Sequence, residues 1–402
     1  MNSYVSLLKT PGVARIIAAQ LTARFPSGML SLAYLLHIEH VHNSFGAAGL
    51  VLAATSIGQA IAGPLTSRWM GVWSMRKVLV LTMVVCAASI AVMGFVIMPV
   101  WAYMLVGFIG GLSTPPIQPA VRTIYPKMVT SKQLTPLFSL DASAQEIIWV
   151  AGPVITTFVA VQISTTVAIS LAGILLIGGG LWFILSPEVG RVRIPRSKRK
   201  FGVVLKKRSV LLATIVGFLL IGACAALEAS VVATFGDHGP ESGIVLAIFA
   251  LGSLVGGLAL GHLPVGPWAM ARRMFIVFAG IAVACAALDF WWLAVTLFIA
   301  GIGIAPALAV MFAIVSATVK FSDTAEAYGW VGTGQLIGAA LGSAFAGFLI
   351  DANGAIGGFL AAAALALVGF LVPLLLRSWS PDLRGRELTS LPDTAPIPVQ
   401  PS

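Results

Sequence analysis

Residues 108–116 read FIGGLSTPP, and residues 298–306 read FIAGIGIAP. The two stretches are separated by an offset of 190 residues and lie within long apolar runs. Three residue pairs share this offset: Pro116 with Pro306, Gln145 with Gln335 and Gly152 with Gly342. Several matches at one offset predict an internal repeat, in which the chain consists of two equivalent halves.

The composition predicts an all-α membrane protein. The 402 residues are 58% hydrophobic and only 9% charged, which is too apolar for a soluble globular protein. About 20 apolar residues in a helix cross the hydrocarbon core, and runs of that length divide the chain into about twelve spans. The expected spans are 13–37, 44–66, 77–98, 100–121, 136–161, 164–186, 209–232, 243–263, 273–289, 291–319, 328–350 and 354–377.

The cations predict the orientation of these spans. Every Lys and Arg except Arg24 falls before or at the start of the first span, at or after the end of the last, or in alternate loops on one side and the span ends that flank them. Because cytoplasmic loops carry an excess of Lys and Arg, both termini are expected in the cytoplasm. The net charge of +10 then reflects topology and contact with anionic lipids, and no nucleic-acid binding is expected.

The repeat and the charge pattern together predict four regions. They are a first six-helix bundle (1–186), a basic cytoplasmic linker (187–208), a second six-helix bundle (209–378) and a disordered cytoplasmic tail (379–402). The tail is rich in Pro, Ser and Thr and cannot bury a core. Two parallel halves around a central site near the membrane midplane are typical of secondary transporters.

The segment between spans two and three carries a recognisable motif. It reads GPLTSRWMG over residues 63–71 and is followed by Arg76 and Lys77. This segment and the twelve spans resemble the major facilitator superfamily, whose signature here contains Gly, Leu, Asp-Arg, Gly and basic residues. The matching positions are Gly63, Leu65, Arg68, Gly71 and Arg76. The resemblance implies a gate held by charge pairing, although Ser67 replaces the family's Asp.

A second resemblance concerns the direction of transport. Gly152-Pro153 in span five is similar to the core of a motif found in proton-driven exporters of the family. Residues 24–29 (RFPSGM), the pattern Pro115-Pro116-x-x-Pro119-x-x-Arg122 and Asp141-x-x-x-Gln145-Glu146 resemble a set of bacterial, largely actinobacterial, members regarded as exporters. We assign Arg122 to the gate and loop signature, since it follows span four. The resemblance implies efflux in exchange for protons, across the inner membrane of a bacterial cell.

The polar residues inside the spans are candidates for a substrate or proton pathway. With a rise of 1.5 Å per residue, Arg24 and Asp141 each lie about 13 Å beyond the nearest flanking cation, so they can form an ion pair. Asp141, Gln145 and Gly152 share one face of span five, and Glu146 lies about 100° away. Such groups must face the bundle interior or a polar cavity.

Each of these residues also has a purely structural interpretation. Arg24 and Asp141 can be a static pair that holds spans one and five together, and Glu146 and Glu228 can be neutral, hydrogen-bonded carboxyl groups. Glu228 lies either in the cavity or at the outer mouth of span seven, and Gln335 repeats the position of Gln145. Pro116, Pro153 and Pro306 are expected to interrupt or kink helices, and Gly152 to allow close packing.

The sequence therefore predicts a proton-coupled exporter, or antiporter, of a small organic molecule or drug that acts as a monomer by alternating access. One alternative is an importer of an anionic small molecule or a sugar, which Arg24 would suit. Another is a receptor or scaffold that does not transport. No catalytic triad, nucleotide loop or metal-ligand cluster occurs, so we expect no enzyme activity, no cofactor and no metal.

Overall fold

The computed structural model describes residues 7–197, 199–235 and 241–384, and this part of the chain is helical without strands. The first group of helices precedes the link between residues 192 and 207: α2 (Val13–Arg24), α3 (Pro26–His42), α4 (Phe45–Trp73), α5 (Met75–Phe95), α6 (Val100–Leu112), α7 (Ile117–Met128), α8 (Ser131–Gln162), α9 (Thr165–Leu185) and the short α10 (Pro187–Arg191). The second group follows it: α11 (Arg208–Phe235), α12 (Glu241–Leu260), α13 (Ala269–Ala284), α14 (Phe290–Ile302), α15 (Ile304–Thr318), α16 (Phe321–Asn353) and α17 (Ala355–Leu375).

Ten helical segments of the described chain are long and apolar enough to cross a membrane. Two of the twelve expected spans differ in form. The first is divided into α2 and α3 at Phe25, immediately before Pro26, and α13 has only 16 residues. A proline removes a backbone donor and clashes with the preceding turn, which explains the break. The twelve-span topology therefore remains a prediction.

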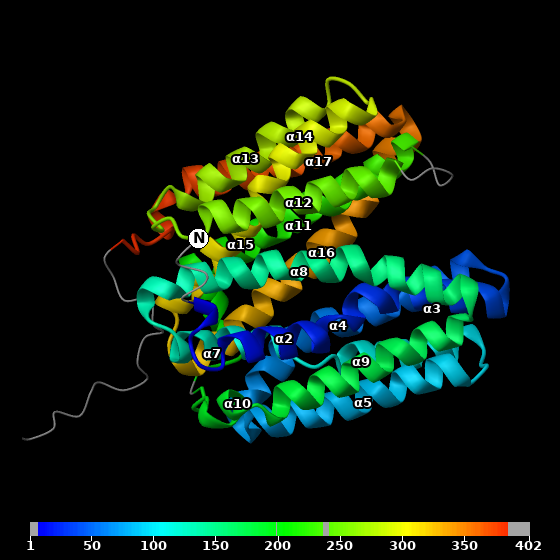
Figure 1. The fold of residues 1–402 in the computed structure, drawn as a ribbon, viewed down its shortest axis with the longest axis horizontal. Helices are drawn as coiled ribbons and strands as arrows, with labels where there is room; N and C mark the ends of the chain where they lie inside the picture. The colour runs from blue at the N-terminus through cyan, green and yellow to red at the C-terminus, as the bar shows by residue number, and fades with distance from the viewer. Residues whose placement is uncertain (1–6, 198, 236–240, 385–402) are drawn as a thin grey trace, which may run out of the picture.

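Within each group the helices pack mainly on one another. In the first group α4 packs on α6, and both α2 and α5 pack on α9. In the second group α11 packs on α16 and α17, and α12 on α14 (Figure 1). Contacts between the groups are made by α4, α7 and α8 on one side and by α12, α15 and α16 on the other. These six helices position the candidate site.

The repeated stretches of the sequence form breaks at equivalent places. Between α6 and α7 the chain leaves the helix at Ser113 and resumes after Pro116, and between α14 and α15 it breaks at Gly303, with Pro306 in the first turn of α15. Pro153 does not end a helix, because α8 runs through it as one α-helix from Ser131 to Gln162. The freed carbonyl of a membrane helix can find other partners, so a proline need not terminate it.

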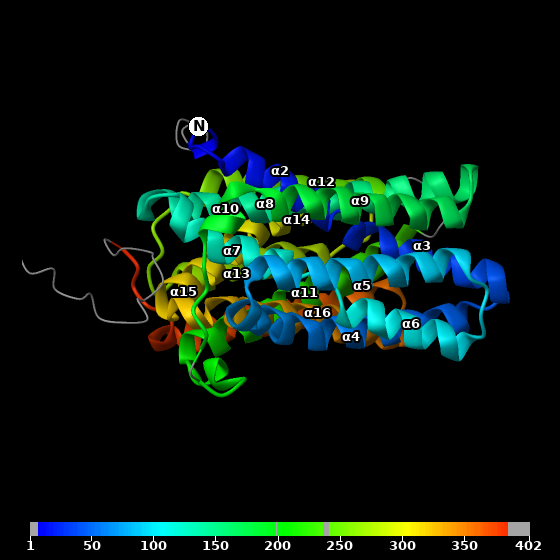
Figure 2. The same ribbon diagram turned by 90° about the horizontal axis from the view of Figure 1, so that it is seen from below.

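We call the end of the molecule that carries the link the basic end. There the N-terminal side of α2, the link and the C-terminal side of α17 lie together (Figure 1, Figure 2). Arg122 is an exception among the cations expected in its loops, because it lies within α7 and is 1% exposed. The span continues beyond the expected end at residue 121, since α7 extends to Met128.

The start of the expected tail is packed against the second group. Leu383 is buried, and its backbone N–H donates to the carbonyl oxygen of Val265 at 2.9 Å. Residues 380–384 thus differ from the expectation of disorder, because an apolar side chain there finds a buried position. The rest of the tail, 385–402, lies outside the described residues.

Candidate functional site

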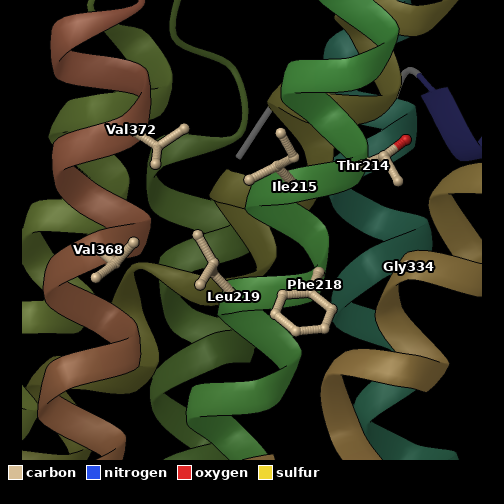
Figure 3. Close-up of a pocket in the computed structure, with 7 residues that line it drawn as sticks. All are labelled: Thr214, Ile215, Phe218, Leu219, Gly334, Val368 and Val372. Atoms are coloured by element: carbon tan, nitrogen blue, oxygen red, sulfur yellow. The ribbon is translucent and has the colours of Figure 1, made fainter. Parts of the chain in front are cut away.

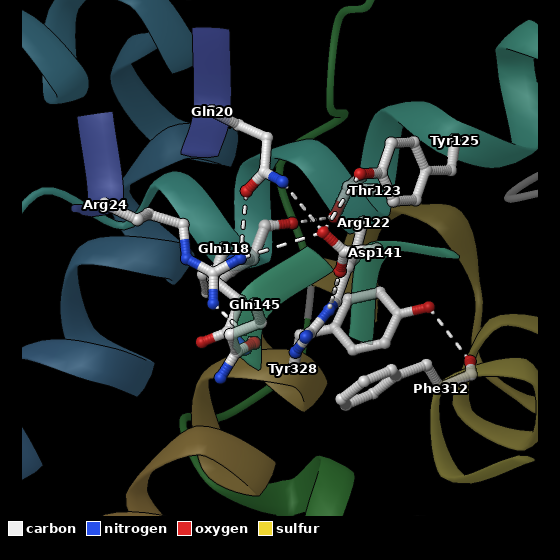
Figure 4. A network of polar contacts seen from close by, with 11 residues as sticks. Gln20, Arg24, Gln118, Arg122, Thr123, Tyr125, Asp141, Gln145, Phe312 and Tyr328 are labelled. Atoms are coloured by element: carbon white, nitrogen blue, oxygen red, sulfur yellow. Dashed lines mark hydrogen bonds and ion pairs between the residues drawn. The ribbon is translucent and has the colours of Figure 1, made fainter. Parts of the chain in front are cut away.

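The centre of the first group contains a buried polar network around Asp141 of α8 (Figure 4). Its carboxylate is fully buried and accepts hydrogen bonds from Gln20 Nε2 at 2.9 Å and from Tyr125 Oη at 3.2 Å. Arg122 Nε lies 3.2 Å from Oδ2, and Arg24 Nη1 lies 3.7 Å from Oδ1. Four side chains, two from α2 and two from α7, therefore converge on the carboxylate of Asp141.

Arg24 is the last residue of α2 and joins this network from the break before Pro26. Its Nη1 donates to Gln20 Oε1 at 2.9 Å and its Nη2 to Gln145 Oε1 at 2.6 Å. The ion pair between Arg24 and Asp141 that equal depth predicts is confirmed. The side chain of Arg24 remains 11% exposed, so this cation lies at the edge of the network.

Arg122 belongs to the network and not to a gate loop. Its guanidinium carbon lies 3.4 Å from the ring centroid of Phe312 in α15, which links the network to the second group. The amide group of Gln118 lies beside its two terminal nitrogens, and with the amide oxygen turned toward them it accepts from both, at 2.6 and 2.7 Å. The spacing of Gln118, Arg122 and Tyr125 by four and three residues puts them on one helix face. That spacing is the sequence signal that could have identified Arg122.

The network carries more positive than negative charge. Two guanidinium groups, those of Arg24 and Arg122, surround the single carboxylate of Asp141. Ionisable groups inside a membrane are costly, and they are satisfied here by one another and by glutamine side chains. The arrangement stabilises the first group and leaves one uncompensated cation beside the interface between the groups.

Glu146 makes a different contact. It follows Gln145 in α8 but points toward the second group, where its Oε1 accepts a hydrogen bond from Ser253 Oγ of α12 at 3.0 Å. The carboxyl group of Glu228 in α11 is close enough to interact with it electrostatically. Glu228 is exposed. Its position in the cavity or at the outer mouth stays a prediction.

Gln335 is not part of either cluster. In the described chain its side chain makes no hydrogen bond, and it packs in α16 beside Gly217 of α11, where a Cβ atom would lie 3.3 Å from its Cγ. The repeat relates it to Gln145 in sequence, but only Gln145 has an Arg partner. The equivalent glutamines of the two halves thus have different surroundings.

The repeated glycines do make the same kind of contact in both groups. A Cβ atom on Gly152 would lie 2.7 Å from the backbone of Gly28 in α3, and one on Gly342 would lie 2.2 Å from the carbonyl oxygen of Gly222 in α11. In each case two helices approach with no side chain between them, as small residues permit.

The motif of residues 63–71 lies within the last turns of α4, at a closed contact between the first and second groups of helices. A Cβ atom on Gly63 of α4 would lie 3.1 Å from the carbonyl oxygen of Gly329 in α16. Next to it, Thr333 Oγ1 donates to the carbonyl oxygen of Ala60 at 2.7 Å. One turn further toward the basic end, Arg68 Nη1 lies 2.7 Å from Glu326 Oε2. The carboxylate that pairs with Arg68 is therefore on the opposite group.

The link is attached to the same acidic turn of α16. Ser197 Oγ donates to Asp323 Oδ1 at 2.5 Å, and Arg199 Nε lies 3.7 Å from Asp323 Oδ2. The backbone N–H of Gly202 donates to Glu326 Oε1 at 2.8 Å. Arg68 donates in turn to the carbonyl oxygen of Arg199. These contacts hold the link across the closed contact.

The other motif residues also bind the link or its flanks. A Cβ atom on Gly71 would lie 3.1 Å from the carbonyl oxygen of Pro195, so the link passes close to α4 there. Arg76 donates to the carbonyl oxygens of Ile184 and Ser186 at 3.1 and 3.3 Å, at the end of α9. Ser67, which replaces the family's Asp, is buried with no partner for its hydroxyl in the described structure.

A second contact between the groups joins α8 to α12. Ser139 Oγ donates to the carbonyl oxygen of Gly257 at 2.6 Å, and a Cβ atom on Gly261 would lie 2.1 Å from Ser139 Oγ. Together with the pairs of α4 and α16, this contact lies on the basic side of Glu146. The groups are thus closed against each other at the basic end.

An apolar cavity of about 420 Å³ lies elsewhere, between α11, α16 and α17 (Figure 3). Its lining includes Phe218 of α11 and Val368 of α17 and contains no charged side chain. Its one hydroxyl side chain, Thr214, donates to the carbonyl oxygen of Val210 in its own helix, so the polar clusters of α8 are the better candidate site.

Comparisons with known proteins agree with this architecture. The family model for the Major Facilitator Superfamily matches residues 16–288 and 223–398. No curated protein matches the chain.

Solved structures share the fold at low identity. The human organic anion transporter MFSD10 (TETRAN) aligns with a TM-score of 0.69 and 16% identity, over 90% of this chain and 100% of that one. A bacterial homologue of the iron transporter ferroportin in an outward-facing state gives 0.71 and 11%, over 92% and 99%. The E. coli fucose:proton symporter gives 0.70 and 14%, over 90% and 98%. The chain belongs to the major facilitator superfamily, and it is a multi-pass membrane transporter and not an enzyme.

Proposed function

We propose that this protein exports a small organic molecule in exchange for protons by alternating access, with its two six-helix halves rocking about the α8 site. The observation that carries this proposal is the hydrogen bond between Glu146 and Ser253. This hydrogen bond joins the carboxyl group of Glu146, in the middle of the first group of helices, to α12 of the second group of helices. Adding or removing a proton at Glu146 changes this contact directly.

Glu146 is a better proton carrier than Asp141. Asp141 is fully buried, and four donors from its own group are directed at it. Protonation there would leave two Arg side chains without a counter-charge, which is costly in a buried site. Glu146 has no Arg or Lys partner in the described structure, so its proton can be exchanged without breaking an ion pair.

The closed contact at the basic end supports the second half of the proposal. Opening of the basic end requires that Gly63 separates from Gly329 and Arg68 from Glu326. Both are local contacts between the two groups of helices, so they can break together when the helix groups move as rigid bodies. The ferroportin homologue with a similar fold was solved in an outward-facing state. If the basic end is cytoplasmic, as the cations predict, this structure is closed toward the cytoplasm of the bacterial cell.

Uptake of an organic anion is the second candidate. It is favoured by the excess of one cation in the Asp141 network and by the partial exposure of Arg24. The human relative in fold is an organic anion transporter. A carboxylate or similar group on a substrate would neutralise the extra charge through a bidentate contact.

Proteoliposomes containing the purified full chain and an internal pH-sensitive dye test the proposal. A panel of organic cations, neutral drugs and organic anions is added under an imposed proton gradient. Export by exchange predicts that one of them moves against its own gradient while protons move in the opposite direction. Glu146→Gln is expected to abolish the proton movement. Glu241→Gln, which changes an exposed Glu at the start of α12, is the matched control.

Two results would contradict this assignment. If substrate and protons move in the same direction, the protein is a symporter. If Glu146→Gln retains normal proton exchange, Glu146 is not the carrier. Equal loss of activity in the Glu241→Gln control would mean that the effect is one of folding.

A further inference from the structure

A second cavity, of about 400 Å³, lies at the basic end of the second group. It is formed where the chain leaves α12 at Leu260 and enters α13 at Ala269. Three arginines contribute to its lining, namely Arg272, Arg273 and Arg384. It is separate from the Asp141 network, which belongs to the first group, so its role is independent of the proposed transport function.

Arg273 is the central residue of this cavity. Its side chain is only 6% exposed. Nη1 donates to the carbonyl oxygen of Ala269 at 3.0 Å and Nη2 to that of Leu260 at 3.4 Å, while Nε has no partner. Within the described residues no carboxylate lies within ion-pair distance. Buried charges in proteins are normally paired, so this one lacks a counter-charge.

The neighbouring charged residues do not supply the counter-charge that Arg273 lacks. Arg272, the residue before Arg273 in α13, is exposed and adds a second cation. Arg384 is bound by Asp382, with Nη2 and Oδ2 2.6 Å apart, so that carboxylate is already paired. Arg377 lies near the same surface, with its guanidinium carbon 5.0 Å from the ring centroid of Trp268. The cavity therefore has a net positive charge.

The rest of the lining is apolar or aromatic. Leu260, Leu263, Trp268 and Ile276 surround the guanidinium groups. A ligand with an anionic head and an apolar body would satisfy both parts of this surface. Tryptophan side chains are also enriched where a protein crosses the membrane interface, and basic pockets on the cytoplasmic side of membrane helices suit anionic head groups.

We propose that this cavity binds the phosphate group of an anionic ligand, with Arg273 and Arg272 as its ligands. A guanidinium group presents a planar set of donors that matches phosphate oxygens in a bidentate contact. Two sources share this chemistry: the head group of an anionic phospholipid and a soluble phosphate compound. The position beside Trp268 at the end of the bundle is accessible to both.

The test uses the full chain purified in a neutral detergent. Native mass spectrometry and thermal unfolding are measured with phosphatidylglycerol, with phosphatidylcholine and with inorganic phosphate. Arg272→Gln removes an exposed cation and should not affect folding. We expect it to weaken binding about fivefold, as loss of one interfacial cation implies. Arg273→Lys keeps the charge but loses the planar donor set, and it should weaken binding as well. Arg193→Gln, an exposed cation of the link, is the control and should bind normally.

The outcomes separate the two sources. Retention of phosphatidylglycerol over phosphatidylcholine, reduced by Arg272→Gln and not by Arg193→Gln, supports the site with a lipid as ligand. Binding of inorganic phosphate with the same dependence, and with no preference among lipids, supports it with a soluble ligand. If Arg272→Gln and Arg273→Lys bind both ligands as well as Arg193→Gln does, the cavity is not a phosphate site.

Discussion

Gly63 and Gly329 touch main chain to main chain: a Cβ atom on Gly329 would lie 2.5 Å from the carbonyl oxygen of Gly63. Helices α4 and α16 therefore cross with no side chain between them at the basic end. This approach brings Thr333 within hydrogen-bond distance of Ala60 and Arg68 within reach of Glu326. The closed state of the basic end depends on the absence of a side chain at these two positions.

Gly329→Val should open the basic end, because its methyl groups cannot fit against the backbone of α4. The readout is maleimide labelling of Ser139→Cys, which lies at the distant α8–α12 contact and is fully buried. The native Cys86, Cys224 and Cys285 are replaced by alanine in this background. We expect labelling at least about tenfold faster, which corresponds to a shift of about 1.4 kcal/mol in the equilibrium.

Gly332→Val is the control on the same helix, since nothing lies within 4 Å of its Cβ position. It should label at the rate of the unchanged background. Equal acceleration by both variants, or none by Gly329→Val, would show that the glycine contact does not control closure.

Arg68 and Glu326 should be energetically coupled across the groups. Arg68→Gln and Glu326→Gln each remove one charge of a pair whose carboxylate is almost buried, with 4% of its side chain exposed. In a double-mutant cycle on the same labelling rate we expect a coupling free energy of about 1 kcal/mol. Additive effects would mean that Arg68 acts through its bond to the link alone.

Asp141→Ala should destabilise the protein more than Arg24→Ala. Removal of the carboxylate leaves Arg24 and Arg122 buried without a counter-charge, whereas removal of Arg24 leaves Asp141 paired with Arg122. Loss of one partner of a buried pair costs about 3–5 kcal/mol. Thermal unfolding of the purified variants gives the order. A smaller effect of Asp141→Ala would mean that this carboxylate is not the centre of the network.

Ser253→Ala should favour opening of the basic end without removing proton exchange. It deletes one hydrogen bond between the groups, worth about 0.5–1.5 kcal/mol, and leaves the Glu146 carboxyl group in place. Ser139→Cys labelling should rise severalfold, while proton movement in proteoliposomes continues. Complete loss of proton movement would instead assign Ser253 to the proton path itself. Ser230→Ala, a buried serine bonded within α11, is a suitable control.

The sequence predicted the Arg24–Asp141 pair because depth in a membrane helix follows from a fixed rise per residue. It also predicted that Asp141, Gln145 and Gly152 share a face, since all three contact α2 or α3. Both results need only regular geometry within one helix. The pair also requires that α2 and α8 turn these side chains toward each other, which the structure supplies.

Arg122 was missed for the opposite reason. A cation close to the end of an apolar run resembles a loop residue. Its spacing from Gln118 and Tyr125 indicates a shared helix face, and the packing against Phe312 and Asp141 shows that this face is buried. Glu326, the partner of Arg68, is 258 residues away in sequence, so no local pattern connects them. The hydrogen bond between the backbones of Leu383 and Val265 is likewise a tertiary contact, which composition does not indicate.

The link that crosses the basic end has an optical consequence. Phe201 lies between Arg68, whose guanidinium carbon is 5.8 Å from its ring centroid, and Trp330 of α16, whose ring centroid is 5.6 Å away. The indole N–H of Trp330 is buried without a partner. When α4 and α16 separate, Arg68 withdraws from this stack and the indole meets water, while Phe201 stays with the link on α16. The emission spectrum of Trp330, isolated as the difference from Trp330→Phe, would then report the conformational cycle in real time, with no label attached.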